Sequence, residues 1–278
     1  MGESNRRQAV RVTCELPIRL IGDDVEHIGT IVDLSRTGLR VRIPGSDLGI
    51  HRLSSLVQVT RSLHASLGDV FVGDLHHEML GPLVQRQLTP CRIAKRDWEQ
   101  TDVEVGCQFD VPLRDEEVGM LGVPLPGVGQ DEAPESLHGA GPRRRSEDEP
   151  RPTRPHLREP EAPSYVAYVY PAPGKTSKPL ITSTRSLTRG MAILSVDEGQ
   201  GWDLPALAVA DLVMALDAAY GTSILLRVVD GDQDLWAGPA ELQEVDVAPG
   251  THRIKLGVAF GRELRTEELG RLGLPTPA

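Results

Sequence analysis

The chain has 278 residues, a formal net charge of −10, 25% charged residues and 39% hydrophobic residues. This length suits two domains, and the composition is that of an ordinary globular protein. The acidic balance and the aromatic content of only 4% argue against binding of long nucleic acids, which normally needs basic patches or stacking side chains. No apolar run is long enough to span a membrane, and the N-terminus lacks the apolar core of a signal peptide. We therefore expect a cytoplasmic protein without membrane insertion.

The first half alternates apolar and polar residues in short runs that are typical of half-buried strands. The opening run has apolar residues at every second position, at Val10, Val12, Cys14, Leu16, Ile18 and Leu20. Further strands are expected over residues 27–34, with Ile28, Val32 and Leu34 on one face, over 39–43, and over 103–109. Short strands separated by Gly, Asp and Pro predict a closed or nearly closed antiparallel β-barrel. A short helix over residues 115–121, capped by Asp115, is expected to follow it.

Residues 62–88 fit neither a strand nor a helix pattern well, and we expect an excursion between strands of this barrel. The segment contains His76 and His77. Adjacent side chains point in different directions on any regular element, so no metal site is predicted there.

Residues 127–162 are rich in Pro, Gly, Glu, Asp and Arg, with sparse apolar residues and no period. Such a segment cannot bury enough apolar surface to offset the entropy of ordering, so it predicts a disordered linker. Its basic run, Arg143–Arg145, is followed at once by acidic residues and is interpreted as solvated charge. The expected organisation is therefore a barrel over 1–126, a linker over 127–162 and a second domain over 163–278.

The segments on either side of the linker resemble each other. Val105–Phe109 matches Leu256–Phe260, and the match continues without a gap from Leu113–Gly122 to Leu264–Gly273. An ungapped match of this length indicates an internal duplication, and two copies mean tandem domains. The fold class predicted is therefore mainly β, with two small antiparallel barrels that are each closed by a short C-terminal helix.

The second copy is expected to begin with a strand over residues 165–170. Residues Leu212–Leu216 look helical by composition, but the repeat lays Leu212 and Val213 on Leu56 and Val57. We therefore predict a strand at this position.

Two short patterns in the first half carry the chemistry. The first is Arg-x-x-x-Arg at Arg7 and Arg11, just before the opening strand, with Arg6 beside it. The second is Asp-x-Ser-x-x-Gly at Asp33, Ser35 and Gly38, between the second and third strands. Alone, each has an ordinary interpretation, as surface charge or as a turn.

Together, in this order and on these elements, the two patterns resemble those of the PilZ family of cyclic di-GMP receptors. The resemblance covers about residues 5–126, and Gly106–Phe109 is similar to the family's closing strand. It implies that Arg7, Arg11, Asp33, Ser35 and Gly38 bind cyclic di-GMP, with Arg6 as an additional contact. Arginine can pair with guanine or phosphate, and Asp33 can accept from guanine donors. Gly38 would allow a positive φ in the turn.

In the second copy, the repeat sets Arg185 opposite Asp33 and Leu187 opposite Ser35, while Gly190 keeps the turn. The pair Arg154 and Arg158 has the spacing of the first pattern but lies in the Pro-rich linker. We therefore expect a degenerate barrel that does not bind the nucleotide alone and serves as a surface for an unidentified protein partner. A homodimer is left open.

Three function classes are weighed. The leading one is a bacterial, non-catalytic cyclic di-GMP receptor that regulates motility or biofilm formation through a protein partner. The alternative is an interaction module that binds no nucleotide. An enzyme is disfavoured, because no nucleophile motif, phosphate-binding glycine loop or metal cluster stands out. The cysteines Cys14, Cys91 and Cys107 are widely spaced, and Cys14 and Cys107, which fall on the apolar phase of strand patterns, are interpreted as core residues of a reducing compartment. No cofactor and no metal are expected beyond the ligand.

Overall fold

The structure is a computed structural model of the chain, and it describes residues 11–22, 25–51, 54–77, 81–95, 101–123, 164–196, 208–247 and 253–276. Among these residues, no helix is long and apolar enough to cross a membrane.

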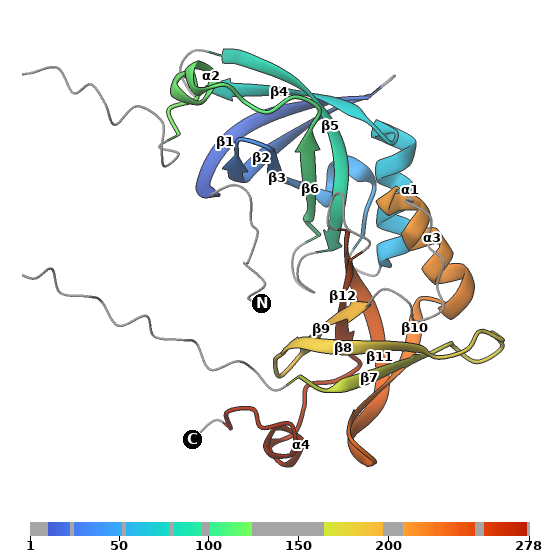
Figure 1. The fold of residues 1–278 in the computed structure, drawn as a ribbon. Helices are drawn as coiled ribbons and strands as arrows, with labels where there is room; N and C mark the ends of the chain where they lie inside the picture. The colour runs from blue at the N-terminus through green and yellow to red at the C-terminus, as the bar shows by residue number, and fades with distance from the viewer. Residues whose placement is uncertain are drawn as a thin grey trace, which may run out of the picture.

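The N-terminal half forms a closed, six-stranded antiparallel barrel (Figure 1). Its strands are β1 (Val12–Ile21), β2 (Glu26–Ser35), β3 (Gly38–Ile43), β4 (Phe71–His77), β5 (Gly81–Lys95) and β6 (Val103–Phe109). They follow the order β5-β4-β1-β2-β3-β6, and β6 pairs back onto β5 to close the barrel. A 3-10 helix η1 (Gly45–Leu48) and helix α1 (Leu56–Leu67) connect β3 to β4, and α2 (Asp115–Met120) follows β6.

The C-terminal half repeats this arrangement element by element. Its elements are β7 (Val166–Tyr170), β8 (Leu180–Leu187), β9 (Met191–Val196), α3 (Val209–Tyr220), β10 (Ser223–Asp230), β11 (Gln233–Val247), β12 (Ile254–Phe260) and α4 (Thr266–Arg271). The strands follow the order β10-β7-β8-β9-β12-β11, and β10 also pairs with β11. The predicted fold class of two small barrels, each followed by a short helix, is confirmed. The domain limits stay a prediction, because the predicted linker lies outside the described residues.

The two barrels are joined by a strand pairing and a helix contact. Strand β5 pairs with β11 at Arg92↔Asp246, Ile93↔Val245 and Ala94↔Glu244, and α1 contacts α3 on one side of the molecule (Figure 1). Ile93 and Val245 occupy the same place in their barrels, because each pairs with the matching residue of the last strand, Val105 or Leu256. The barrels are thus related by an approximate two-fold axis that passes between Ile93 and Val245.

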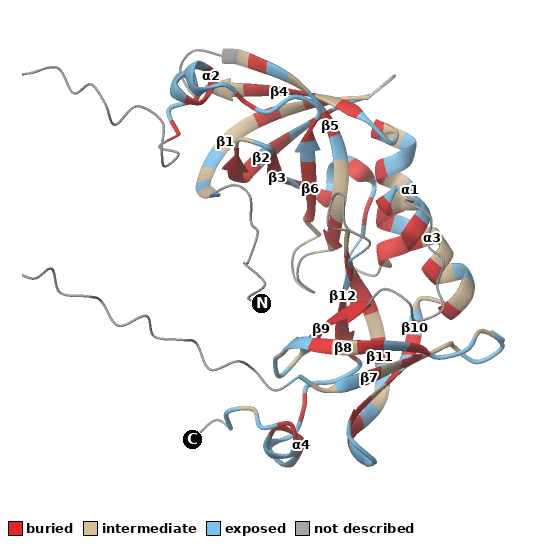
Figure 2. Ribbon diagram, viewed as in Figure 1, coloured by how far each residue is buried: buried red, intermediate tan, exposed pale blue. Residues whose placement is uncertain are grey.

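Alternation along the strands and helical periodicity together build the core. Buried positions recur along the strands of both barrels and along α1 and α3 (Figure 2). On α1, the buried residues Leu56, Val59, Leu63 and Leu67 lie three or four positions apart, which places them on one face. The first strand follows its predicted phase, with Ile18 and Leu20 buried.

The expectation for residues 62–88 is wrong. They contain the end of α1, all of β4 and the first half of β5, so they belong to the barrel. Helix α1 begins with a capping box, in which Ser55 Oγ accepts from Gln58 N at 3.3 Å and Gln58 Oε1 accepts from Ser55 N at 2.8 Å. It ends at Gly68, which has a φ of 74°. Ser-x-x-Gln followed by a later glycine is a helix signature, and it agrees with the apolar residues that lie three or four positions apart along α1.

The predicted strand at Leu212–Leu216 is also wrong, because these residues lie within α3. The repeat does relate this segment to the first half, but its counterpart α1 is itself a helix. The local composition, rich in Ala and Leu, gave the correct answer.

Two finer expectations are corrected as well. Ile28 is 68% exposed, and the residues buried on this part of β2 are His27, Gly29 and Ile31. Asp115 does not cap α2; the N-cap is Arg114, whose backbone N donates to Glu117 Oε2 at 2.8 Å. Glu268 accepts from Arg265 N in the same way in α4, at 2.7 Å.

Candidate ligand-binding site

A β-bulge near the end of β2 aims Asp33 outward. Between β2 and β3, Ile31 pairs with Val41 and Asp33 with Arg40, so Val32 is an extra residue in the ladder. The extra residue reverses the alternation of the strand. Odd-numbered residues face the core up to Ile31, whereas Leu34 faces the core after the bulge. Bulges commonly re-aim side chains at functional sites. Here the bulge turns Asp33 to the outer surface of the barrel.

Two arginines hold the carboxylate of Asp33. Arg11 Nη1 lies 3.1 Å from Asp33 Oδ1, and Arg40 Nη2 lies 2.6 Å from Asp33 Oδ2. The Asp33 side chain is only 10% exposed, whereas that of Arg11 is 49% exposed. The carboxylate is therefore held from the side of β3 by Arg40, and the half-exposed Arg11 covers it from the side of solvent.

A second carboxylate continues this cluster on β6. Glu104 Oε2 lies 3.3 Å from Arg40 Nη1, and Glu104 Oε1 lies 3.5 Å from Arg42 Nη2. The Glu104 side chain is 3% exposed. Arg40, Arg42 and Glu104 are site residues that the sequence analysis missed. Their only signal was that each lies on the outward phase of a strand.

Ser35 and Gly38 stabilise the turn between β2 and β3 from within, and the Ser35 side chain is not displayed at the surface. Ser35 is 2% exposed, and its Oγ donates to Gly38 O at 3.0 Å. Gly38 is not among the described glycines with a positive φ, so that expectation is wrong. Its role is close approach: a Cβ there would lie 2.3 Å from Cys107 O on β6. Only glycine fits this contact between β3 and β6.

The structure thus brings Arg11 and Asp33 together, and it pairs Ser35 with Gly38 in the turn that follows Asp33. Arg6 and Arg7 lie outside the described residues. So do Arg154 and Arg158.

The ladder also corrects the alignment of the second copy. Leu113 N donates to Arg36 O, and Leu264 N donates to Arg189 O, so Arg36 corresponds to Arg189. The counterparts of the motif therefore lie one residue beyond those that the sequence suggested: they are Ser186 for Asp33, Thr188 for Ser35 and Met191 for Gly38.

The second barrel keeps the turn and lacks the charges. Thr188 Oγ1 donates to Met191 O at 3.1 Å, just as Ser35 does in the first barrel. The place of Arg40 is taken by Ile193, which pairs with Ser186 in the ladder. The place of Glu104 is taken by Lys255, which pairs with Asp246. The prediction that the second copy lacks the hydroxyl of Ser35 is wrong, because Thr188 supplies it. The prediction that it lacks the carboxylate of Asp33 is correct, because Ser186 takes that place.

The chemistry of the first-barrel site is that of binding. Guanidinium groups can pair with anionic oxygens, and a carboxylate can accept from a ligand's N–H groups. Burial, followed by the charge of Asp33, raises the pKa of the nearby Cys14 thiol to about 11, so it stays protonated at neutral pH. Within the described part of the chain, no group of three or more His, Cys, Asp or Glu side chains could hold a metal ion.

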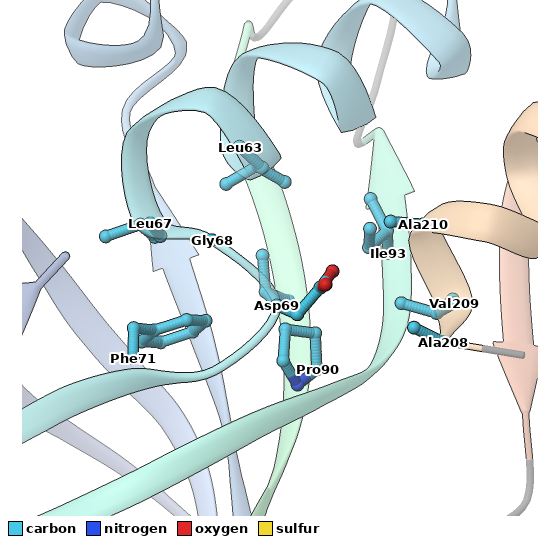
Figure 3. Close-up of a pocket in the computed structure, with 11 residues that line it drawn as sticks. Leu63, Leu67, Gly68, Asp69, Phe71, Pro90, Ile93, Ala208, Val209 and Ala210 are labelled. Carbon is cyan, nitrogen blue, oxygen red and sulfur yellow. The ribbon is translucent and has the colours of Figure 1, made fainter. Parts of the chain in front are cut away.

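A separate pocket lies where the barrels meet, between α1, β5 and the start of α3 (Figure 3). Its lining is apolar apart from Asp69 and includes Leu63, Phe71, Ile93 and Val209. No arginine or lysine lines it, so it does not suit an anionic ligand.

The fold and the site together define a tandem β-barrel protein whose polar site lies on the outer face of the first barrel. The family comparison agrees with this description. Residues 5–122 match the PilZ domain, and the chain therefore contains a PilZ domain in its N-terminal half. The match includes every residue of the predicted site. No curated protein matches the sequence.

Several solved structures are similar over most of the chain. The PlzA protein of Borreliella burgdorferi, in complex with c-di-GMP, is 11% identical, covers 95% of this chain and 92% of its own, and has a TM-score of 0.30. The Bacillus subtilis inhibitor of motility, MotI/DgrA, is 7% identical over 95% of each chain, with a TM-score of 0.29. YcgR of Escherichia coli, in complex with c-di-GMP, is 10% identical over 93% of this chain and 80% of its own, with a TM-score of 0.22. These scores are low, and the family assignment rests on the PilZ match.

Proposed function

We propose that the protein is a receptor for cyclic di-GMP and that the nucleotide binds on the outer face of the first barrel. The observation that carries this proposal is the Asp33 carboxylate, turned outward by a bulge and flanked by Arg11 and Arg40 within a PilZ domain. The residues expected from the two motifs, Arg7 and Asp33 among them, all lie inside the matched segment.

Each group has a role that suits the ligand. Asp33 accepts from the N1 and N2 donors of a guanine, which discriminates against adenine. Arg11 pairs with a guanine edge or a phosphate, and Arg6 and Arg7 add further contacts from the segment before β1. Ser35 and Gly38 contribute through the turn that they build, because it sets the position of Asp33.

Binding requires Arg11 to exchange its partner. In the structure Arg11 is half exposed and paired with Asp33. Because its guanidinium faces solvent, Arg11 can turn to an anionic oxygen of the ligand while the guanine donors take its place on the buried carboxylate. Arg40 is less exposed and paired on both sides, which keeps Asp33 in place during the exchange.

The same proposal makes the protein an adaptor without catalytic activity. It acts through the second barrel on a protein partner and thereby regulates motility or biofilm formation. Two features support a non-catalytic role in a reducing cytoplasm. All three cysteines are free thiols. Burial raises the pKa of Cys91 to about 11, as it does for Cys14, so neither is a ready nucleophile.

One observation favours the alternative, an interaction module that binds no nucleotide. The second barrel keeps the whole scaffold with Ser186 and Ile193 in the places of Asp33 and Arg40. The scaffold therefore does not need the charged site for folding.

Calorimetric titration of cyclic di-GMP into the full chain tests the proposal. We expect saturable binding that weakens by about 100-fold or more in Arg7→Ala/Arg11→Ala, because charge-assisted contacts are lost. The matched control is Arg189→Ala/Arg227→Ala, which removes two exposed arginines of the second barrel. Its affinity should stay within about 2-fold of the wild type, since exposed charges far from a site are screened. Absence of heat with the wild type would leave the interaction module as the function.

A further inference from the structure

Arg92 lies at the junction of the two barrels and faces both. It is a residue of β5 that pairs with Gly106 on β6 and with Asp246 on β11. Its Nε donates to Glu244 Oε1 of the second barrel at 2.7 Å, and both side chains are 19% exposed. This contact is a direct ionic bond between the barrels.

On its other side, Arg92 reaches the candidate site. Arg92 Nη1 lies 3.9 Å from Glu104 Oε2, the same oxygen that lies 3.3 Å from Arg40 Nη1. Arg40 in turn holds Asp33. A row of alternating charges therefore runs from the second barrel to the binding site, in the order Glu244, Arg92, Glu104, Arg40, Asp33 and Arg11.

The inner members of this row are poorly accessible to water, so their charges act strongly on one another. Glu104 is 3% exposed and Arg92 is 19% exposed. Burial, the largest single influence, would lower the pKa of Arg92, but the hydrogen bond and charge of Glu244 together with the charges of Asp246 and Glu104 outweigh it, and the pKa is raised. Groups that share one ion-pair network influence one another's positions and energies.

The ion pair between Arg92 and Glu244 can form only when a first barrel is joined to a second one. Arg92 and Glu244 hold equivalent places, because each pairs with the matching glycine of its last strand, Gly106 or Gly257. Two identical barrels joined by this edge would set arginine near arginine, or glutamate near glutamate. Opposite charges at equivalent positions make the contact attractive only between the two different barrels.

We propose that Glu244 is a positioning residue for the ligand site on the first barrel, acting through Arg92, Glu104 and Arg40. The inference rests on the proposed function of that site. Without Glu244, Arg92 turns fully to Glu104 and displaces Arg40 from it. Arg40, which already contacts Asp33, then has this carboxylate as its main partner and competes with the ligand for it.

The test is the affinity of the full chain for cyclic di-GMP. Glu244→Gln should weaken binding by roughly 3- to 10-fold, within the range of couplings that pass through residues that do not touch a ligand. The matched control is Asp234→Asn, which removes the same charge from an exposed pair of the same barrel. Its affinity should stay within about 1.5-fold of the wild type. Because a partial loss of folding lowers the titrated stoichiometry, an unchanged stoichiometry separates positioning from damage to the fold.

A double-mutant cycle identifies the route. In an Arg92→Gln background, Glu244→Gln should have no further effect, because its link to the site is already cut. An equal effect in both backgrounds, tighter binding by Glu244→Gln, or an unchanged affinity would each overturn the inference while the receptor function stands. Absence of binding to the wild type would overturn the receptor function and this inference with it.

Discussion

The first and second barrels have the same strand order and the same turn after the second strand, but different charges on that turn. The turn hydroxyl is present in both, as Ser35 and as Thr188, and each donates to the carbonyl three residues later. The outward carboxylate and its arginine are present only in the first, where Ser186 and Ile193 are the counterparts of the second. The hydroxyl therefore belongs to the scaffold, and the charged pair belongs to the site that we propose.

The largest effect is expected when the first barrel receives the residue that the second barrel has in the place of Asp33. Asp33→Ser should weaken cyclic di-GMP binding by about 100-fold or more, because Arg11 and Arg40 lose their shared acceptor and guanine loses its own. Calorimetric titration measures the change. A loss of less than about 3-fold would mean that Asp33 is not in the site. Ser186→Asp is the reciprocal control, and it should create no new binding because Ile193 replaces the supporting arginine.

The next largest effect concerns the glycine of the turn. Gly38→Ala should lower the free energy of unfolding by about 1–3 kcal/mol, because the added methyl group meets the backbone of β6. The equivalent change in the second barrel, Met191→Ala, should stay within about 0.5 kcal/mol, because that side chain is partly exposed. Urea unfolding of the two variants distinguishes these values. Similar losses in both would show that the two turns are packed alike.

A smaller effect tests a feature that the barrels share. The pKa of Glu117 is lowered from 4.5 to about 2, chiefly by the hydrogen bond from Arg114. The pKa of Glu268 is also lowered to about 2, chiefly by the hydrogen bond from Arg262. A lowered pKa in the folded state means that the stability from each carboxylate is complete above its ordinary pKa of 4.5 and is lost as the pH falls toward 2.

Both barrels should therefore lose stability in the same acidic window. The double variant Glu117→Gln/Glu268→Gln should reduce this pH dependence, since glutamine can keep the capping contact without a charge. Urea midpoints at about pH 7 and about pH 3 give the comparison. An unaltered slope in the variant would assign the acid sensitivity to other carboxylates.

The smallest effect is expected where the outer faces differ. Asp74 is 8% exposed and is bonded by Arg19 and Gln85, whereas its ladder counterpart is Arg227, whose partner Asp234 is 56% exposed. Asp74→Asn should cost about 1–2 kcal/mol of unfolding free energy, and Asp234→Asn less than about 0.5 kcal/mol. Thermal unfolding measures both, and equal costs would contradict this ranking.

The sequence predicted the barrels and the contact between two residues of the candidate site because these depend on local patterns. The alternation of apolar residues predicted β1, and the two motifs predicted that Arg11 and Asp33 act together, which agrees with the ion pair between them. It failed at α1, where the Ser55-x-x-Gln58 signature was overlooked, and at Ile28, whose phase depends on the bulge at Val32. The alternation of a single strand does not predict such a bulge, because a bulge is an extra residue relative to the partner strand.

The remainder of the site could not be predicted from one sequence. Glu104 is distant from Asp33 along the chain and joins it only because β6 pairs with β3. Glu244 is still further away and reaches the cluster only through the junction of the barrels. The offset of one residue in the second motif has the same origin, because the true counterparts are set by ladder pairing.

The pairing of β5 with β11 also bears on how the chain is made. Strand β4 pairs with β5 only as far as Leu88, so residues 92–94 have an unpaired edge until β11 joins them. Exposed strand edges invite pairing with other chains. The ribosome supplies β11 about 150 residues after β5, a delay of roughly 8–30 s at typical rates of synthesis. During that interval, the nascent first barrel carries an open edge whose intended partner has not yet been translated.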